Sequence, residues 1–205
     1  EFRRVLFRSV MHALIVVSHP LNTSLTHSVA AAIAQGVAES GSHHSAEIAD
    51  LTREGFSPVF AEPDIAAFRQ TGATPSDAIA EQARIDNADA LVLVFPIYWW
   101  SMPGLLKGWI DRVFSNGWAY EETADGNVVK KLGRLRVHLV ALGAASQQTY
   151  DKHGFTDAFN AQIVHGIFDY CGATVASSQM LLLPDLQTTE AHLEAGRQLG
   201  RKMFG

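Results

Sequence analysis

The segment that most constrains the fold runs from residue 90 to residue 120. Residues 91–95 are five consecutive apolar side chains, which is typical of a parallel strand covered on both faces. Pro96 cannot donate to a strand ladder, and an amphipathic helix pattern follows Pro103. Between the two prolines lie three aromatic residues, Tyr98, Trp99 and Trp100. Because open α/β sheets bind ligands at the carboxyl ends of their strands, this turn predicts either a wall for a flat ligand or a plug for the core.

The rest of the chain alternates strand patterns with helix patterns. We expect the other strands at residues 13–17, 45–51, 135–142 and within 173–183. We expect five helices: one that ends near residue 40, one that follows residue 103, and three at residues 76–87, 157–170 and 190–203. Residues 52–75 predict an irregular excursion with one helical turn, and residues 121–133 predict a loop. This alternation predicts an α/β fold, a five-stranded, parallel, doubly wound sheet with helices on both faces.

Composition and charge exclude several classes of protein. The net charge is -5 and the Lys and Arg residues are scattered, so we expect no nucleic-acid partner. No run of about 18 apolar residues is present, so we expect no integral membrane segment. The single cysteine, Cys171, follows an apolar helix pattern and has no partner for an internal disulfide, which fits a buried residue in a cytoplasmic protein. We interpret residues 1–10 as a non-native leader and residues 11–205 as a single domain, because a clean strand pattern begins at Met11.

The loop at residues 18–26 has the composition of an anion site. It offers four hydroxyl groups next to the free N–H groups of a helix start, where the helix dipole attracts anions. It contains neither G-x-G-x-x-G nor G-K-[ST], so a Rossmann fingerprint and a P-loop are both unsupported. The alternative is an ordinary helix cap made by Thr23 or Ser24.

Three loops are expected to meet at one place. With the strand order 2-1-3-4-5, the loops at residues 18–26, 96–102 and 143–153 emerge on one rim, beside the switch point between the first and third strands. The first loop suits an anionic tail, the second a flat ring, and the third the close approach of a ligand to backbone. A ligand with a phosphate and a flat ring is a flavin more readily than a sugar phosphate.

The chain resembles the flavodoxin-like NAD(P)H:quinone oxidoreductases, which include the DT-diaphorase type and bacterial relatives such as the potassium-efflux ancillary reductases. The resemblance covers residues 11 to about 186, and its most specific part is FPIYWWSMPGLLKGWIDRVF at residues 95–114, followed by GWAY at residues 117–120. It implies a flavodoxin-like fold, non-covalent FMN or FAD, and NADPH or NADH as electron donor. It also implies a homodimer with the site at the interface, and a two-electron, ping-pong reduction of quinone-like acceptors.

The resemblance also implies roles for individual residues. The segment that holds the flavin phosphate is matched by His19, Ser24, Leu25 and Thr26. The segment beside the flavin ring is matched by Pro96, Ile97, Tyr98, Trp99 and Trp100, and the loop near the pyrimidine edge by Gly143, Ala144 and Ala145. The positions beside the reacting face are matched by Tyr150 and His153, where we expect proton handling, and an aromatic residue that reaches the partner's pocket is matched by Tyr120. The third loop departs from the family's Thr-Thr-Gly-Gly, and the added methyl groups narrow the approach to its backbone.

Other functions stay open at this point. The chain could be a flavin-binding regulatory or ancillary subunit of a partner such as a transporter, or a one-electron carrier of the flavodoxin type. No metal site is expected, because the adjacent His43 and His44 do not form an H-x-x-x-H pair. Ser146 is not in a G-x-S-x-G motif, which argues against an α/β-hydrolase. The residues do not choose between FMN and FAD, between NADPH and NADH, or among acceptors.

Overall fold

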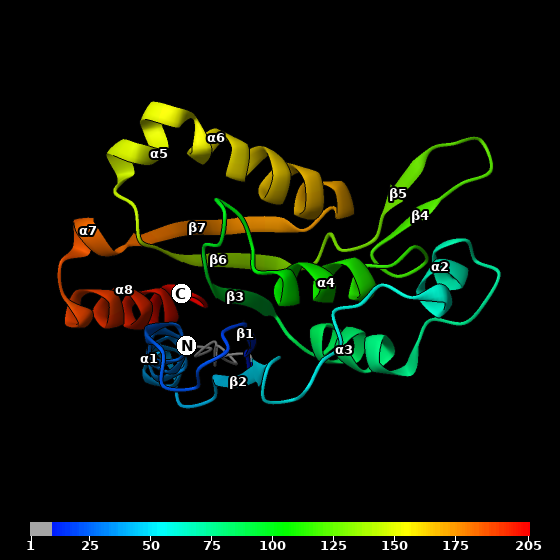
Figure 1. Ribbon diagram of the computed structural model, residues 1–205. Helices are drawn as coiled ribbons and strands as arrows, with labels where there is room; N and C mark the ends of the chain where they lie inside the picture. The colour runs from blue at the N-terminus through cyan, green and yellow to red at the C-terminus, as the bar shows by residue number, and fades with distance from the viewer. Residues whose placement is uncertain (1–9) are drawn as a thin grey trace, which may run out of the picture.

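The computed structural model describes residues 10–205, so all but Val10 of the expected leader lies outside the described residues. Five parallel strands form the central sheet in the order β2-β1-β3-β6-β7, as Figure 1 shows. Their bounds are β1 His12–Val17, β2 Ser45–Asp50, β3 Ala90–Pro96, β6 Arg136–Gly143 and β7 Thr174–Leu182. The prediction of a parallel, doubly wound sheet in this order is confirmed.

Helices cover both faces of the sheet. One face packs against α1 (Leu25–Ser40) and α8 (Thr189–Lys202). The other packs against α3 (Ser76–Asp86), α4 (Gly104–Val113) and the π-helix η1 (Asn160–Asp169). The close packing of α1 on α8 depends on small residues, since a Cβ on Gly36 would overlap the carbonyl oxygen of Arg197. No helix among residues 10–205 is both long and apolar enough to cross a membrane.

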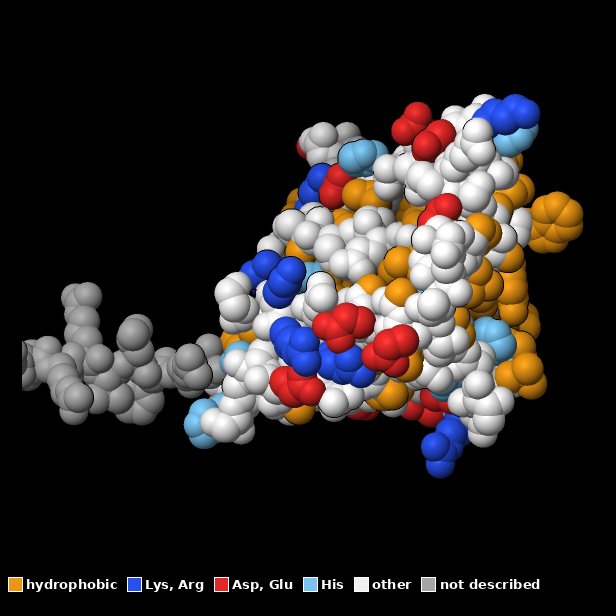
Figure 2. All heavy atoms as spheres, turned by 90° about the vertical axis from the view of Figure 1, so that its left-hand side faces the viewer, with side chains coloured by type: hydrophobic (Ala, Val, Ile, Leu, Met, Phe, Trp, Pro, Cys, Tyr) orange, Lys and Arg blue, Asp and Glu red, His pale blue; other side chains and the backbone are white. Residues whose placement is uncertain are grey.

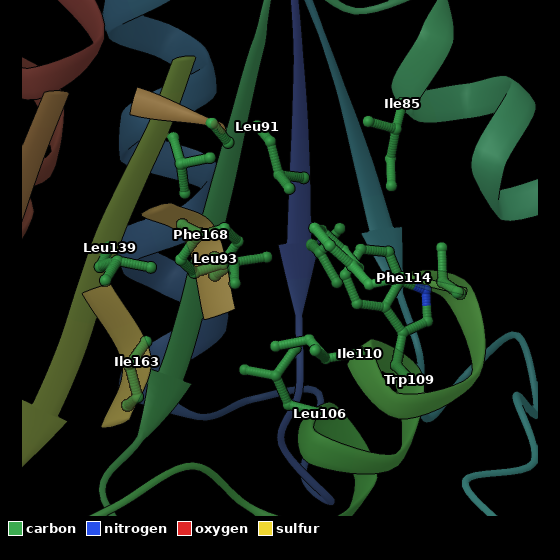
Figure 3. Packing of buried hydrophobic residues seen from close by; sticks show 14 of the residues in the cluster. Ile85, Leu91, Leu93, Leu106, Trp109, Ile110, Phe114, Leu139, Ile163 and Phe168 are labelled. Carbon is green, nitrogen blue, oxygen red and sulfur yellow. The ribbon is translucent and has the colours of Figure 1, made fainter. Parts of the chain in front are cut away.

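The strand residues divide between two apolar layers because neighbouring side chains point to opposite faces. Leu91 and Leu93 of β3 point to the layer under α4 and η1, where Trp109 and Phe168 pack, as Figure 3 shows. The alternate β3 residues, such as Val92, point to the layer under α1 and α8. The apolar run at residues 91–95 is therefore explained by burial on both sides.

Several predicted elements differ from the structure. A two-stranded hairpin, β4 (Tyr120–Glu122) with β5 (Val128–Lys130), replaces the loop expected after Tyr120. The helical turn expected within residues 52–75 is present as the longer helix α2 (Glu62–Phe68), whose second residue is a proline and whose Asp64 carboxylate accepts from the N–H of Ala61 at 2.8 Å. Short helices, α5 (Gln147–His153), α6 (Phe155–Phe159) and α7 (Leu183–Leu186), lie in or beside the predicted loops.

The helix pattern of residues 76–87 predicts Ile79, Ala83 and Ile85 as the buried positions of α3, and this prediction is correct only for Ile85. Ile79 and Ala83 are exposed, and the buried positions are instead Ala78, Glu81, Gln82 and Ile85. The polar residues on this face are buried because they have buried partners. The indole N–H of Trp109 donates to the Glu81 carboxylate at 2.8 Å, and the Gln82 amide donates to the carbonyl oxygen of Val113 at 2.8 Å.

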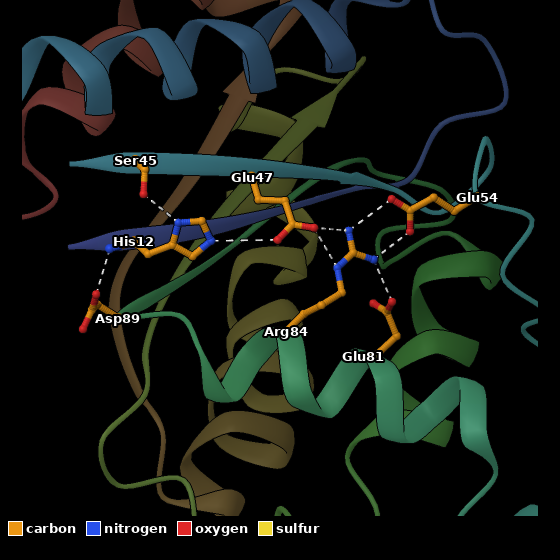
Figure 4. A network of polar contacts seen from close by, with 7 residues as sticks. All are labelled: His12, Ser45, Glu47, Glu54, Glu81, Arg84 and Asp89. Atoms are coloured by element: carbon orange, nitrogen blue, oxygen red, sulfur yellow. Dashed lines mark hydrogen bonds and ion pairs between the residues drawn. The ribbon is translucent and has the colours of Figure 1, made fainter. Parts of the chain in front are cut away.

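Arg84 connects α3 to the edge of the sheet. Its guanidinium forms ion pairs with Glu47, Glu54 and Glu81, each with a shortest distance of 2.7 Å (Figure 4). These hydrogen bonds raise the pKa of Arg84 above its ordinary value. A second cluster, in which Arg112 pairs with Asp64 and Asp77, fixes the excursion against α4. The two arginines therefore hold the long excursion to the rest of the domain.

Candidate functional site

Backbone hydrogen bonds tie together the three loops that follow β1, β3 and β6. The N–H of Ser18 donates to the carbonyl oxygen of Val94 at 3.3 Å, which joins the first loop to β3. The N–H of Ile97 donates to the carbonyl oxygen of Leu142 at 2.7 Å, which joins the second loop to β6. The structure thus brings the three loops to one rim, at the carboxyl ends of the strands.

The first loop ends in Ser24, which is the N-cap residue of α1. The Ser24 hydroxyl accepts from the N–H of His27 at 3.3 Å, so the capping interpretation is correct for Ser24. The same hydroxyl lies 2.9 Å from Nδ1 of His27, whose Nε2 lies 2.8 Å from the Asp50 carboxylate. The side chain of Leu25 packs against the core, and that of Thr26 is buried. Because these are the first two residues of α1, their backbone N–H groups have no partner within the helix and are available at the rim.

His27 and Asp50 were not predicted as site residues. Their role is to fix the Ser24 hydroxyl, and their spacing of 23 residues along the chain gives no local signal. His19 lies beside them, with its ring centroid 6.3 Å from that of His27, and it accepts from the N–H of Leu21 at 3.0 Å. A hollow of about 350 Å³ lies next to His19 and reaches Asp50 and Arg53.

The second loop is a tight turn with two tryptophans in the left-handed region. Tyr98 and Ser101 exchange both backbone hydrogen bonds at 3.1 Å, and Trp99 and Trp100 have φ angles of 47° and 64°. This conformation normally favours glycine or asparagine, so the bulky side chains strain the backbone. The Trp99 side chain is 93% exposed, and Tyr98 is also exposed. Figure 2, which views the left-hand side of Figure 1, shows hydrophobic side chains gathered along one edge of this face.

Trp100 joins the second loop to the segment after β6. Its ring stacks on Phe155 with centroids 3.9 Å apart and planes 14° apart, and it meets the Tyr150 ring edge-on at 5.4 Å. The ring of His153 is exposed and stacks on Phe155, with the two ring centroids 5.4 Å apart. Phe155 was not predicted as a site residue. An aromatic residue two positions after the expected histidine is the signal that could have found it.

The third loop is shaped by Gly143. A Cβ on Gly143 would lie 2.7 Å from Cδ2 of Leu182 and 3.0 Å from the Tyr150 hydroxyl oxygen, so the tyrosine occupies the space that glycine leaves. Tyr150 is only 1% exposed, and burial raises the pKa of its hydroxyl above the ordinary value. Ala144 is exposed and Ala145 is half-buried, which leaves their backbone at the rim.

Tyr120 does not join the other predicted residues within one chain. It lies on β4, at the opposite end of the molecule from α5 (Figure 1), with its ring 5.3 Å from that of Tyr170. Burial and the neighbouring Tyr170 raise the pKa of Tyr120 to about 12. Both tyrosines line a cavity of about 420 Å³ that also contacts Phe60 and Phe68.

Cys171 and the possible metal ligands do not form a second candidate site among residues 10–205. Cys171 is buried, as expected, and burial raises the pKa of its thiol to about 11. Among residues 10–205, no group of three or more His, Cys, Asp or Glu side chains is placed to hold a metal ion. The rim is therefore the principal candidate site of the chain.

Comparison with known proteins gives the family. Residues 11–200 match the family model described as "Flavodoxin-like fold". The chain belongs to this family. Among its relatives is the uncharacterized NAD(P)H oxidoreductase YcaK of Escherichia coli, which is 34% identical over 142 residues, or 69% of this chain and 68% of that one. The chain matches only 51% of the length of the human ribosyldihydronicotinamide dehydrogenase [quinone], with 31% identity over 118 residues.

Solved structures share the fold. The NAD(P)H:quinone oxidoreductase from Methanothermobacter marburgensis superposes with a TM-score of 0.83 at 24% identity, covering 95% of this chain and 100% of that chain. An FMN-dependent NADH-azoreductase from Bacillus anthracis, in complex with FMN, superposes with a TM-score of 0.73 at 14% identity, covering the same shares. These likenesses support the flavodoxin-like architecture of the sheet and its rim.

Proposed function

We propose that this protein is a flavin-dependent NAD(P)H oxidoreductase that reduces quinone-like acceptors by two electrons, with residues 11–205 as one flavin-binding domain. The observation that carries the proposal is the meeting of three chemically different loops at one rim. A capped helix start, an exposed aromatic turn and a small-residue loop are joined there by backbone hydrogen bonds. The names of its relatives, an NAD(P)H oxidoreductase and an NAD(P)H:quinone oxidoreductase, support the same activity.

A flavin fits the residues of this rim. The backbone N–H groups of Leu25 and Thr26, at the start of α1, suit a phosphate, because helix N-termini attract anions. The exposed Trp99 suits the face of a flat ring, and the backbone of Ala144 and Ala145 suits its polar edge. When bound, the flavin supplies the chemistry of hydride and electron transfer.

The chain's own residues would position the reactants and handle protons. The buried Tyr150 hydroxyl, whose pKa is raised, stays protonated and can donate a hydrogen bond at the edge of Gly143. His153 faces solvent on the adjacent turn, where its imidazole can take or give a proton. We propose that donor and acceptor occupy the same space above the rim in turn, which gives ping-pong kinetics.

Anaerobic stopped-flow absorbance tests this proposal. The flavin-loaded protein is mixed with NADPH or with NADH, and then with benzoquinone. We expect rapid two-electron bleaching of the flavin band with at least one nucleotide, followed by reoxidation by the quinone. Absence of bleaching with both nucleotides would favour a flavin-binding regulatory subunit or a one-electron carrier, neither of which accepts a hydride from a nicotinamide.

Two variants test the proton-handling residues. Tyr150→Phe keeps the ring that packs against Trp100 and removes only the hydroxyl, and His153→Ala removes the exposed imidazole. We expect both variants to bind flavin and to lower the rate of flavin reduction or reoxidation by about 10²-fold, the lower end of the range for a positioned acid or base. Normal rates in either variant would remove that residue from the mechanism.

We further propose a homodimer in which Tyr120 of one subunit approaches the rim of the other. Exposed aromatic residues lie at both ends of the molecule, with Trp99 at the rim and Phe60 and Phe68 beside the Tyr120 cavity. Such exposed apolar surface supports the dimer, because it is typical of protein–protein contacts. Phe68→Asp should shift the protein to monomer in analytical ultracentrifugation, whereas Ile79→Asp, at an equally exposed apolar residue on α3, should not. We also propose a cytoplasmic location, supported by the single, buried, unpaired Cys171.

A further inference from the structure

A second polar cavity lies at the opposite end of the strands from the rim. Its volume is about 350 Å³, and it is a solvent-open hollow between α8 and the sheet. The polar residues that line it are Arg136, His138, Ser177, Gln179, Gln198 and Lys202. Arg136 begins β6 and Gly143 ends it, so Arg136 lies about 23 Å from the rim end of the strand at 3.3 Å per residue, and none of the lining residues belongs to the three rim loops. The cavity is therefore separate from the proposed flavin site.

Two cations stand at the mouth of the cavity without partners. Arg136 and Lys202 are exposed, and neither forms an ion pair or a hydrogen bond of its side chain within the described part of the chain. The neighbouring Arg201 differs, because it pairs with Glu39 and Glu194. No carboxylate lines the cavity among residues 10–205. The mouth therefore carries uncompensated positive charge.

The floor of the cavity holds a buried, half-satisfied histidine. His138 is 4% exposed, and its Nδ1 lies 2.8 Å from the Ser177 hydroxyl oxygen. Its Nε2 is buried and has no hydrogen-bond partner within the described residues. Burial and the nearby Arg136 lower the pKa of His138 to about 4, so the ring is neutral near pH 7. When Ser177 donates to Nδ1, Nε2 carries the ring proton and is a donor that lacks an acceptor.

We propose that this cavity binds a small, soluble phosphate monoester. Two cations match the charge of about -2 on a phosphate monoester better than the single charge of one carboxylate. The side-chain amides of Gln179 and Gln198 can donate to phosphate oxygens, and so can Nε2 of His138 in the tautomer that Ser177 favours by donating to Nδ1. The volume exceeds that of a phosphate group alone, and Leu199 and Met203 supply an apolar wall for the organic part. The proposal does not rest on the activity at the rim.

Titration calorimetry of the full chain with ribose 5-phosphate tests the assignment. We expect one saturable site per chain, and we expect Arg136→Gln and Lys202→Gln each to weaken binding at least about tenfold. The control is Arg201→Gln, which removes the same charge from the same helix but does not line the cavity, and which should change the affinity less than about twofold. All three substitutions are at exposed positions, so each variant is expected to fold.

Histidine-ring NMR of the same complexes gives a second readout. Saturation with ribose 5-phosphate should shift the Nε2 resonance of His138 in the wild type, and the shift should be lost in Arg136→Gln. Absence of saturable binding, or equal weakening in all three variants, would overturn the proposal. Co-sedimentation with phosphatidic acid vesicles, without affinity for ribose 5-phosphate, would overturn the assignment to a soluble ligand.

Discussion

The contact between Gly143 and Tyr150 links the stability of the domain to the shape of the rim, and Gly143→Ala tests that link directly. The added methyl group would meet Cδ2 of Leu182 at 2.7 Å and the Tyr150 hydroxyl oxygen at 3.0 Å. Both atoms are at the ends of side chains, so they can move where backbone could not. Displacement of the Tyr150 ring would in turn disturb Trp100, which packs against it edge-on at 5.4 Å.

The size of the effect follows from overpacking. Extra methylene groups in a well-packed core typically cost about 1–3 kcal/mol, and we expect about 1–2 kcal/mol here because the contacted atoms can shift. For a domain of this length, that loss corresponds to a fall in Tm of roughly 2–8 °C. The movement of Tyr150 should also weaken flavin binding several-fold, because the proposed site shares this wall.

Differential scanning calorimetry and flavin fluorescence titration measure the two effects. The matched control is Gly104→Ala, because a Cβ there meets no atom within 4 Å and the residue begins α4. That change should leave Tm unchanged or raise the stability by up to about 1 kcal/mol, since alanine restricts the unfolded chain more than glycine does. A Gly143→Ala protein with unchanged Tm and unchanged flavin affinity would refute the reasoning about this wall.

Three further changes test the polar and aromatic contacts. Arg84→Gln should lower the free energy of unfolding by about 2–4 kcal/mol in urea titrations, because it leaves three carboxylates together, one of them buried. The hydrogen bond from Arg112 lowers the pKa of Asp77. The stabilisation from this ion pair is therefore complete above the ordinary pKa of 3.8 and is lost as the pH falls through the lowered pKa. Asp77→Asn removes this ionisation, so its acid unfolding below about pH 4, followed by circular dichroism, should be less steep than that of the wild type. Phe155→Ala should cost about 1 kcal/mol beyond the lost packing area and shift the emission of Trp100 to longer wavelength, whereas Phe155→Tyr should preserve both.

The strands that are buried on both faces of the sheet could be predicted from the sequence. The apolar runs in β1, β3 and β6 predict covered parallel strands, and the alternation with helices predicts a doubly wound sheet, whereas the strand order was taken from the flavodoxin-like pattern. The approach of the three loops was also predictable, because carboxyl ends of parallel strands share one rim. Ser24 was predictable as a cap, since its type and its place before a helix pattern are local features.

The sequence was insufficient where a partner far along the chain decides the outcome. Glu81 is buried because Trp109 and Arg84 meet it, and a helix pattern that ranks residues by polarity places it in solvent. The hairpin of β4 and β5 was missed because each strand has only three residues, too short for a detectable alternation. The Trp100–Phe155 stack joins residues 55 positions apart, so no local pattern reports it.

The turn at Tyr98–Ser101 shows why strain and function coincide in this chain. Two bulky residues in the left-handed region cost of order 1–3 kcal/mol each, and glycine would avoid that cost. For Trp100, the stack on Phe155 and the contact with Tyr150 compensate within the same chain. Trp99 is 93% exposed and has no such ring contact within the described residues. Within the chain, the two backbone hydrogen bonds between Tyr98 and Ser101 hold its backbone. The proposed flavin or the proposed second subunit would add the ring contact that Trp100 already has, so both proposals for the rim predict that Trp99 becomes buried on binding.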